Sequence, residues 1–191
     1  MNNILKQICE TKKKELKEIK KKCSLSTLEK IINEKTNRNF KNLLIESKEN
    51  NKNNIIAEIK KGSPSAGVLI EDYFPEKISI KYEKSGVGAI SILTEKNFFY
   101  GEIDHLSLVS KQTNLPIIRK DFIIDSYQIL ESKAYKADAI LLIASILNDF
   151  EIKEFIKISK NYNLDCLIEV HNENELNRVI NIGYPIIGIN N

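Results

Sequence analysis

Apolar residues recur at helical spacing through the first 48 residues of the chain. A long charged segment carries a sparse stripe of apolar positions, namely Ile8, Leu16, Ile19 and Cys23. Two shorter helical patterns follow, at residues 28–32 and 40–44. No run typical of a strand occurs in this region. The pattern therefore predicts that residues 1–48 form an N-terminal helical extension.

From residue 54 onward the pattern changes to short apolar runs separated by helical stretches. Six runs have the length of strands: 55–60, 89–94, 116–120, 139–143, 166–170 and 186–190. Between them apolar residues return to helical spacing, and Gly183 stands where a helix C-cap is expected. Strands that alternate with helices indicate repeated βα units and a parallel sheet. Residues 49–191 are therefore predicted to form this second, α/β part.

Two architectures fit such an alternation, an open doubly wound sheet and a (β/α)₈ barrel. No GxGxxG motif follows the first predicted strand, so the usual dinucleotide-binding fingerprint is missing. Both architectures place their chemistry at the C-terminal ends of the strands. The residues at those ends are therefore the most informative about function.

Four of the six predicted strands carry an ionisable or amide side chain in their last residues. Burial of an unpaired charge is costly, so such residues must be compensated or used. In a barrel the inward-facing ends of these strands would meet as one cluster of Glu58, Lys60, Lys120, Glu169 and Asn190. The alternative is that each of them is a strand end facing solvent. Because the polar residues occupy matching positions at the ends of four strands, we favour one cluster over four separate solvent-facing ends.

Other polar residues carry less information. The loop at 61–67 is small and bendable and could bring hydroxyls and backbone amides to an anion, although its composition is ordinary for a loop. His105 lies in a helical stretch and is expected at the surface, whereas His171 follows Glu169 and could orient a neighbour. Two scattered histidines and three cysteines without CxxC spacing form no metal-ligand set, so no metal is expected.

Composition narrows the cellular context. An odd number of cysteines, three, argues against a disulfide framework and favours a cytoplasmic location. No apolar run is long enough to span a membrane, and no secretory signal is recognised. The net charge is +3, and the lysine clusters near the N-terminus are interleaved with glutamates. With three arginines against 26 lysines, we expect no nucleic-acid partner.

Several segments together resemble a known enzyme family. They are IIAEIKKGSPSAG, AISILTEKNFFYG, PIIRKDFIIDSYQI, ADAILLIA, LIEVHNENEL and IGINN, in this order. This series resembles the indole-3-glycerol phosphate synthases of tryptophan biosynthesis, a branch of aromatic amino acid biosynthesis. The resemblance implies a (β/α)₈ (TIM) barrel preceded by extra helices. It also implies a carboxy-lyase that needs neither a metal nor an organic cofactor.

The resemblance further implies a substrate and residue roles. The phosphorylated small molecule 1-(2-carboxyphenylamino)-1-deoxyribulose 5-phosphate would undergo ring closure, decarboxylation and dehydration to indole-3-glycerol phosphate. Lys120 would be the general acid, Glu169 would assist later proton transfers, and Lys60 would lie near the substrate's carboxylate and phosphate. The substrate-binding positions implied by the resemblance are Glu58, Ser63, Ser65, Phe122 and Asn190.

Compared with the family pattern, the chain is expected to be C-terminally truncated, because only six of eight barrel strands are recognised. Open strand edges would then favour self-association, and little activity is expected of these 191 residues alone. Two alternatives stay open. One is a truncated, non-catalytic barrel fragment, and the other is a different phosphate-binding barrel, such as an isomerase.

Overall fold

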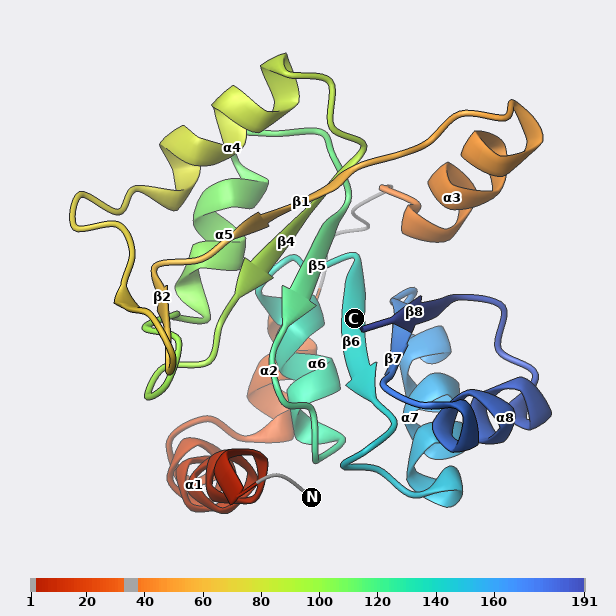
Figure 1. Cartoon of the computed structure of the whole chain (residues 1–191). Coiled ribbons are helices and arrows are strands. Elements are labelled where there is room, and N and C mark those ends of the chain that lie inside the picture. Colours follow the sequence, from red (N-terminus) through yellow and green to blue (C-terminus); the bar gives the residue numbers. More distant parts are fainter. Residues whose placement is uncertain (1–2, 33–37, 191) are drawn as a thin grey trace. The chain divides into compact units, whose positions relative to one another are not determined.

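The computed structural model of the chain describes residues 3–32 and 38–190. Six parallel strands in this part follow one another in chain order, β1-β4-β5-β6-β7-β8 (Figure 1). Their bounds are β1 (Ile56–Ile59), β4 (Ala89–Leu93), β5 (Ile117–Lys120), β6 (Ala139–Ile143), β7 (Asp165–Val170) and β8 (Ile187–Ile189). All six predicted strands are confirmed, within one residue at each end. A doubly wound sheet reverses its strand order, so the sequential order confirms the α/β barrel class.

The chain divides into two compact units, which are described separately. The first unit comprises residues 1–34, 122–134 and 141–191, and the second comprises residues 35–121 and 135–140. The predicted boundary between residues 48 and 49 falls at the end of a helix, α3 (Phe40–Glu49), which precedes β1. The division into an N-terminal extension and a partial barrel stays a prediction.

In the second unit, β4 is the central strand between β1 and β5, and every residue of β4 is buried. Such an apolar strand is typical of a parallel sheet that is covered on both faces. Two helices, α4 (Pro75–Lys84) and α5 (Asp104–Ser110), lie beside these strands (Figure 1). Charged side chains at the C-terminal ends of the strands in this unit include Glu58 on β1 and Lys120 on β5.

A buried ion pair in the second unit holds the starts of β5 and β6. Asp138, just before β6, accepts a hydrogen bond from the backbone N–H of Ile117 at 2.9 Å. Its Oδ2 lies 2.9 Å from Nε of Arg38. Nη2 of Arg38 also donates to Oγ of Ser110 and to the carbonyl of Lys136, both at 3.0 Å. These contacts fix the N-terminal end of the strand that carries Lys120.

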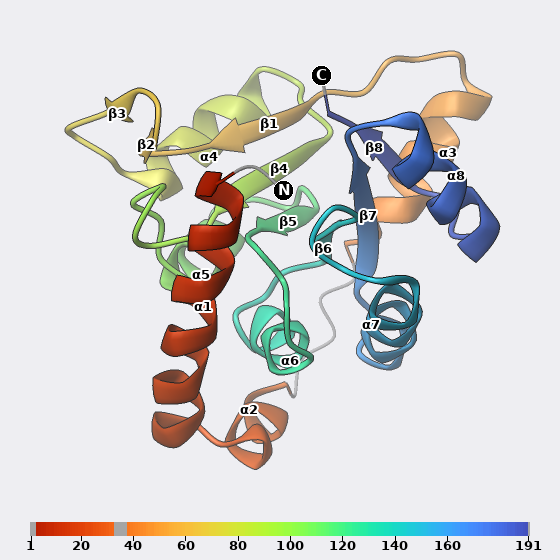
Figure 2. The ribbon, with the colours of Figure 1, turned by 60° about the horizontal axis from the view of Figure 1, so that its bottom comes forward.

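In the first unit, the N-terminal helices contact α6 (Tyr127–Ala134) and the residues around it. Helix α1 (Asn3–Lys22) buries Ile8 and Leu16 of its predicted stripe, and α2 (Leu25–Ile31) lies beside α6 (Figures 1 and 2). The hydroxyl of Tyr127 donates to the carbonyl of Cys23 at 3.0 Å. The predicted N-terminal helices are thus confirmed. None of the described helices is long and apolar enough to cross a membrane.

The remaining helices of the first unit are α7 (Asp149–Asn161) and α8 (Glu173–Ile182), which pack with β7 (Figure 2). Along β7 buried residues alternate with half-buried ones, so Glu169 lies on the less buried face. Gly183 ends α8 with φ at +79°, as predicted for a left-handed C-cap. The loop at 61–67 holds a short hairpin, β2 (Gly62–Ser63) and β3 (Gly67–Val68), which the sequence did not indicate.

Helix α7 begins with a reciprocal capping box. The side-chain oxygen of Asn148 accepts from the N–H of Glu151 at 2.9 Å, and Glu151 Oε2 accepts from the N–H of Asn148 at 2.8 Å. Two backbone donors that would otherwise lack helical partners are thereby satisfied.

We expect Asn148→Ala to lower the free energy of unfolding by about 1 kcal/mol, because it removes one capping acceptor. Asn148→Asp is the matched control and should keep wild-type stability, since its carboxylate still accepts at a helix N-terminus. Urea titrations followed by circular dichroism measure both variants. Equal stability of the alanine and aspartate variants would contradict this prediction.

Candidate active site

One carboxylate in the second unit is shared by two lysines. Glu58 Oε1 lies 2.7 Å from Nζ of Lys60, and Glu58 Oε2 lies 2.7 Å from Nζ of Lys120. Glu58 belongs to β1, Lys60 follows that strand, and Lys120 is the last residue of β5. The structure thus brings together three of the five residues whose phase predicted a cluster.

The sheet register explains how Lys120 reaches Glu58. In the register, Ser91 of β4 pairs with Glu58 on one side and with Ile118 on the other. Leu93 pairs with Lys120, so Lys120 lies two residues beyond Ile118 on the same face of the sheet. The side chain of Lys120 spans the intervening strand β4 to reach Glu58 on β1. The three charged groups then share one face, as expected.

The ionisation of Glu58 follows from its two partners. Burial raises the pKa of this carboxyl, but hydrogen bonds from Lys120 and Lys60 and their positive charges outweigh burial and lower the pKa. A folded pKa below the unfolded value of about 4.3 adds stability above that pH. This stability is lost as the pH falls through the folded pKa. At neutral pH Glu58 is therefore an anionic anchor and not a proton donor.

A second polar group lies in the first unit. Nδ2 of Asn190, just after β8, donates to Oε1 of Glu169 at 3.0 Å. Nε2 of His171 lies 3.3 Å from the same oxygen, and its Nδ1 lies 3.4 Å from Oε2 of Glu175. The backbone N–H of Asn190 donates to the carbonyl of Val170 at 2.9 Å, which fixes its position. His171 thus contacts its neighbour Glu169, as the sequence suggested.

The two groups belong to different units, so their predicted convergence on one barrel mouth stays a prediction. Ser63 and Ser65 lie in the hairpin loop, with their Oγ atoms 3.3 Å apart, and Ser63 Oγ accepts from the N–H of Ala66 at 3.2 Å. Phe122 is half-buried, and its carbonyl accepts from Nε2 of Gln128 at 3.0 Å. Its contact with a substrate ring likewise stays a prediction.

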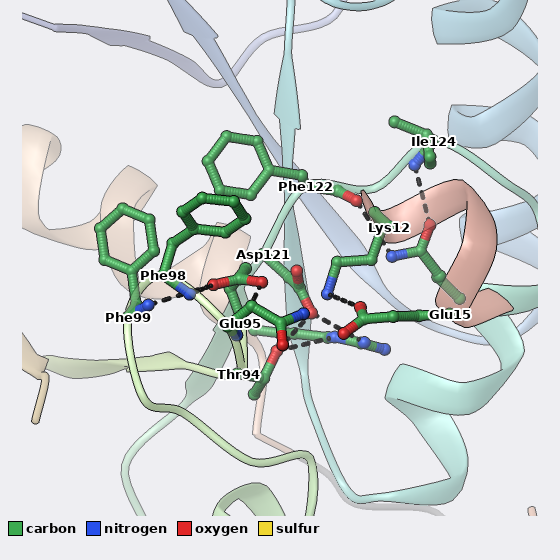
Figure 3. Close-up of polar contacts among 12 residues, drawn as sticks. Lys12, Glu15, Thr94, Glu95, Phe98, Phe99, Asp121, Phe122 and Ile124 are labelled. Atoms are coloured by element: carbon green, nitrogen blue, oxygen red, sulfur yellow. Dashed lines mark hydrogen bonds and ion pairs between the residues drawn. The ribbon is translucent and has the colours of Figure 1, made fainter. Parts of the chain in front are cut away.

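A buried glutamate, which sequence reasoning overlooked, shapes the loop after β4. Glu95 Oε1 accepts from the N–H of Asn97 at 3.1 Å, and Oε2 accepts from those of Phe98 at 2.6 Å and Phe99 at 3.1 Å. The carbonyl of Glu95 accepts from Gly101 at 2.8 Å and closes the loop. Figure 3 shows the two phenylalanine rings pointing away from this carboxylate. The sequence signal that could have pointed to Glu95 is its place directly after the apolar run 89–94.

Further polar residues at the C-terminal end of β5 lie on the face opposite Lys120. Arg119, Asp121 and Thr94 are all buried and contact one another. Because successive side chains of a strand point to opposite faces, Arg119 and Asp121 take the face opposite Lys120. Among the described residues, no group of three or more His, Cys, Asp or Glu could hold a metal ion.

We expect Lys120→Met to raise the pKa of the Glu58 carboxyl, because burial would then be opposed by one ammonium only. Lys60→Met should act in the same direction. Lys61→Met is the control, since it removes a neighbouring lysine instead of a partner of Glu58. Carbon-13 NMR titration of the glutamate carboxyls measures the change. A Glu58 pKa that is the same in all three variants would contradict the arrangement described here.

Comparison with known proteins extends these observations. The family profile described as "Indole-3-glycerol phosphate synthase" matches residues 5–191. A Campylobacter fetus subsp. fetus (strain 82-40) protein of that name is 46% identical over 188 residues, 98% of this chain and 72% of the relative. A Prochlorococcus marinus (strain AS9601) protein of the same name is 47% identical over 191 residues, 99% of this chain and 64% of the relative.

A third relative with this name, from Acetivibrio thermocellus, is 51% identical over 144 residues, 75% of this chain and 55% of its own length. The chain therefore spans about two thirds of the length of the relatives that match it throughout. The match includes the strand ends that carry Glu58, Lys60, Lys120 and Glu169. The chain belongs to the indole-3-glycerol phosphate synthase family of carboxy-lyases.

Proposed function

We propose that this chain carries the catalytic groups of an indole-3-glycerol phosphate synthase. The substrate would be 1-(2-carboxyphenylamino)-1-deoxyribulose 5-phosphate, and the products would be indole-3-glycerol phosphate, carbon dioxide and water. The observation that carries the proposal is the carboxylate of Glu58 holding two ammonium groups at 2.7 Å, at the C-terminal ends of β1 and β5 in a family member. The family match sets aside the alternative of an isomerase on the same scaffold.

In the first step, Lys120 is the general acid. The ring carbon that bears the substrate carboxylate attacks the ribulose carbonyl, and Nζ of Lys120 donates a proton to the carbonyl oxygen as the bond forms. The lysine side chain is 37% exposed, so its ammonium is open to a ligand while Glu58 holds it in place. General acid catalysis of this kind contributes roughly 10²–10⁴-fold to a rate. The two reacting carbons must also be held close together, which a rigid site achieves.

The following steps need no external electron acceptor. Loss of carbon dioxide restores the aromatic ring electrons, and loss of the new hydroxyl as water forms the indole double bond. Atoms and electrons balance among substrate and products, so no redox cofactor is required. We propose that Glu169 assists the proton transfers of this stage. Its carboxylate is 16% exposed, and Asn190 orients it through the bond to Oε1.

The other residues have supporting roles. Lys60 offers a second ammonium for the substrate's carboxylate or phosphate, and Glu58 binds each lysine with a different oxygen. The hydroxyls of Ser63 and Ser65, on the hairpin loop, would close over the substrate, and Phe122 would stack on its aromatic ring. The cytoplasmic location and the self-association expected from open strand edges stay predictions.

Activity is best tested in a completed chain. We define the completed chain as these 191 residues followed by the segment of the Campylobacter fetus relative that lies beyond the matched part. The 191-residue chain alone is tested in parallel, because we expect little turnover from it.

We expect the completed chain to release indole-3-glycerol phosphate, and Lys120→Met to lower kcat by about 10²-fold or more, because the proton donor is lost. Indole fluorescence follows the reaction. Lys111→Met, which changes an exposed lysine at the end of α5, is the control and should keep wild-type kcat. Full activity of Lys120→Met would reject Lys120 as the acid. A completed chain that folds but shows no turnover would instead support the non-catalytic reading.

A further inference from the structure

We propose that Thr94, Arg119 and Asp121 are positioning residues that hold the Lys120 ammonium against Glu58. This inference rests on the proposed function, because it assigns Lys120 the role of the acid. None of the three residues faces the site, since all three side chains lie on the face of the sheet opposite Lys120.

The three side chains form a closed triangle. Thr94 Oγ1 donates to Asp121 Oδ2 at 2.7 Å, and Figure 3 shows these two side chains facing each other. Nε of Arg119 donates to Thr94 Oγ1 at 3.1 Å, and Nη2 of Arg119 lies 2.9 Å from Asp121 Oδ2. The threonine hydroxyl is thus donor to one partner and acceptor from the other. A hydroxyl can do both at once, whereas a methyl group can do neither.

The triangle surrounds the backbone of Lys120. Arg119 and Asp121 are its two chain neighbours, and both are anchored on the same threonine. The backbone N–H of Thr94 also donates to the carbonyl of Lys120 at 3.1 Å. The backbone is therefore held at Lys120 and at the residue on either side of it. Rotation of this backbone would move the lysine side chain away from Glu58, and these three contacts oppose it.

Stability alone does not explain such a network. Burial of charges is costly, and well-packed apolar residues can replace a buried ion pair with equal or greater stability. All three members are nevertheless almost completely buried, between 2% and 5% exposed. A planar guanidinium with directional donors provides orientation that apolar packing does not. At the strand end that carries the acid, orientation is the property that matters, because small displacements of a catalytic group are costly to the rate.

The test compares Thr94→Val with Thr94→Ser. Valine keeps the shape and loses the hydroxyl, whereas serine keeps the hydroxyl and loses a methyl group. Two quantities are measured: the Glu58 carboxyl pKa by carbon-13 NMR in the 191-residue chain, and kcat and KM in the completed chain. Near-ultraviolet circular dichroism checks the fold of each variant.

In Thr94→Val we expect the Glu58 pKa to rise, because the Lys120 ammonium moves away, and kcat to fall at least about tenfold with little change in KM. In Thr94→Ser both quantities should stay at the wild-type values. If Thr94→Val does not fold, Asp121→Asn, which keeps the shape and removes the charge, takes its place with the same expectations.

Two results would overturn the inference. One is a Glu58 pKa and kcat that are the same in the folded valine and serine variants. The other is a loss of stability in Thr94→Val without a change in either quantity, which marks a structural role only. The proposed function fails differently, through a wild-type completed chain without turnover. The Glu58 pKa still decides the positioning role in that case, because it needs no catalysis.

Discussion

The organisation of the second unit depends on one shared charge, the carboxylate of Glu58. Two lysines at a strand end would repel each other, and each would be expensive to desolvate without a partner. A single carboxylate that gives one oxygen to each ammonium removes both difficulties and needs only one half-buried negative charge. Each ammonium keeps further donors for a ligand, because an ammonium has three. The same contact therefore neutralises the charge of each lysine and leaves its ammonium available to a ligand.

Much of this fold could be predicted from the chain itself, because parallel strands that are buried on both faces appear as uninterrupted apolar runs. The runs at 89–94 and 139–143 differ from the observed strands by at most one residue. The alternation of side chains along the strands also predicted that Glu58, Lys60 and Lys120 lie together. This prediction succeeded because residues two apart in a strand point to the same face. The chemical roles came from the resemblance to the enzyme family, since the alternation of side chains indicates only the direction in which each group points.

What escaped prediction depends on contacts that have no periodic signature. The loop shaped by Glu95 arises from side-chain to backbone hydrogen bonds over two to four residues. The triangle joins Thr94 to Arg119 and Asp121, which lie 25 and 27 positions further along the chain, through a register that is known only once β4 and β5 pair. The hairpin of β2 and β3 has two residues in each strand, which is too few for any alternation to show.

The bonds from Glu95 have an evolutionary consequence. One carboxylate determines the path of the loop by binding the main chain, so the loop's own side chains are released from that task. Phe98 and Phe99 contribute backbone donors to the fold, and any residue other than proline supplies the same donor. Substitutions at these two positions can therefore alter what the loop presents to a ligand without altering the loop. Glu95 sets the path of the loop, and the side chains at positions 98 and 99 can change without changing that path.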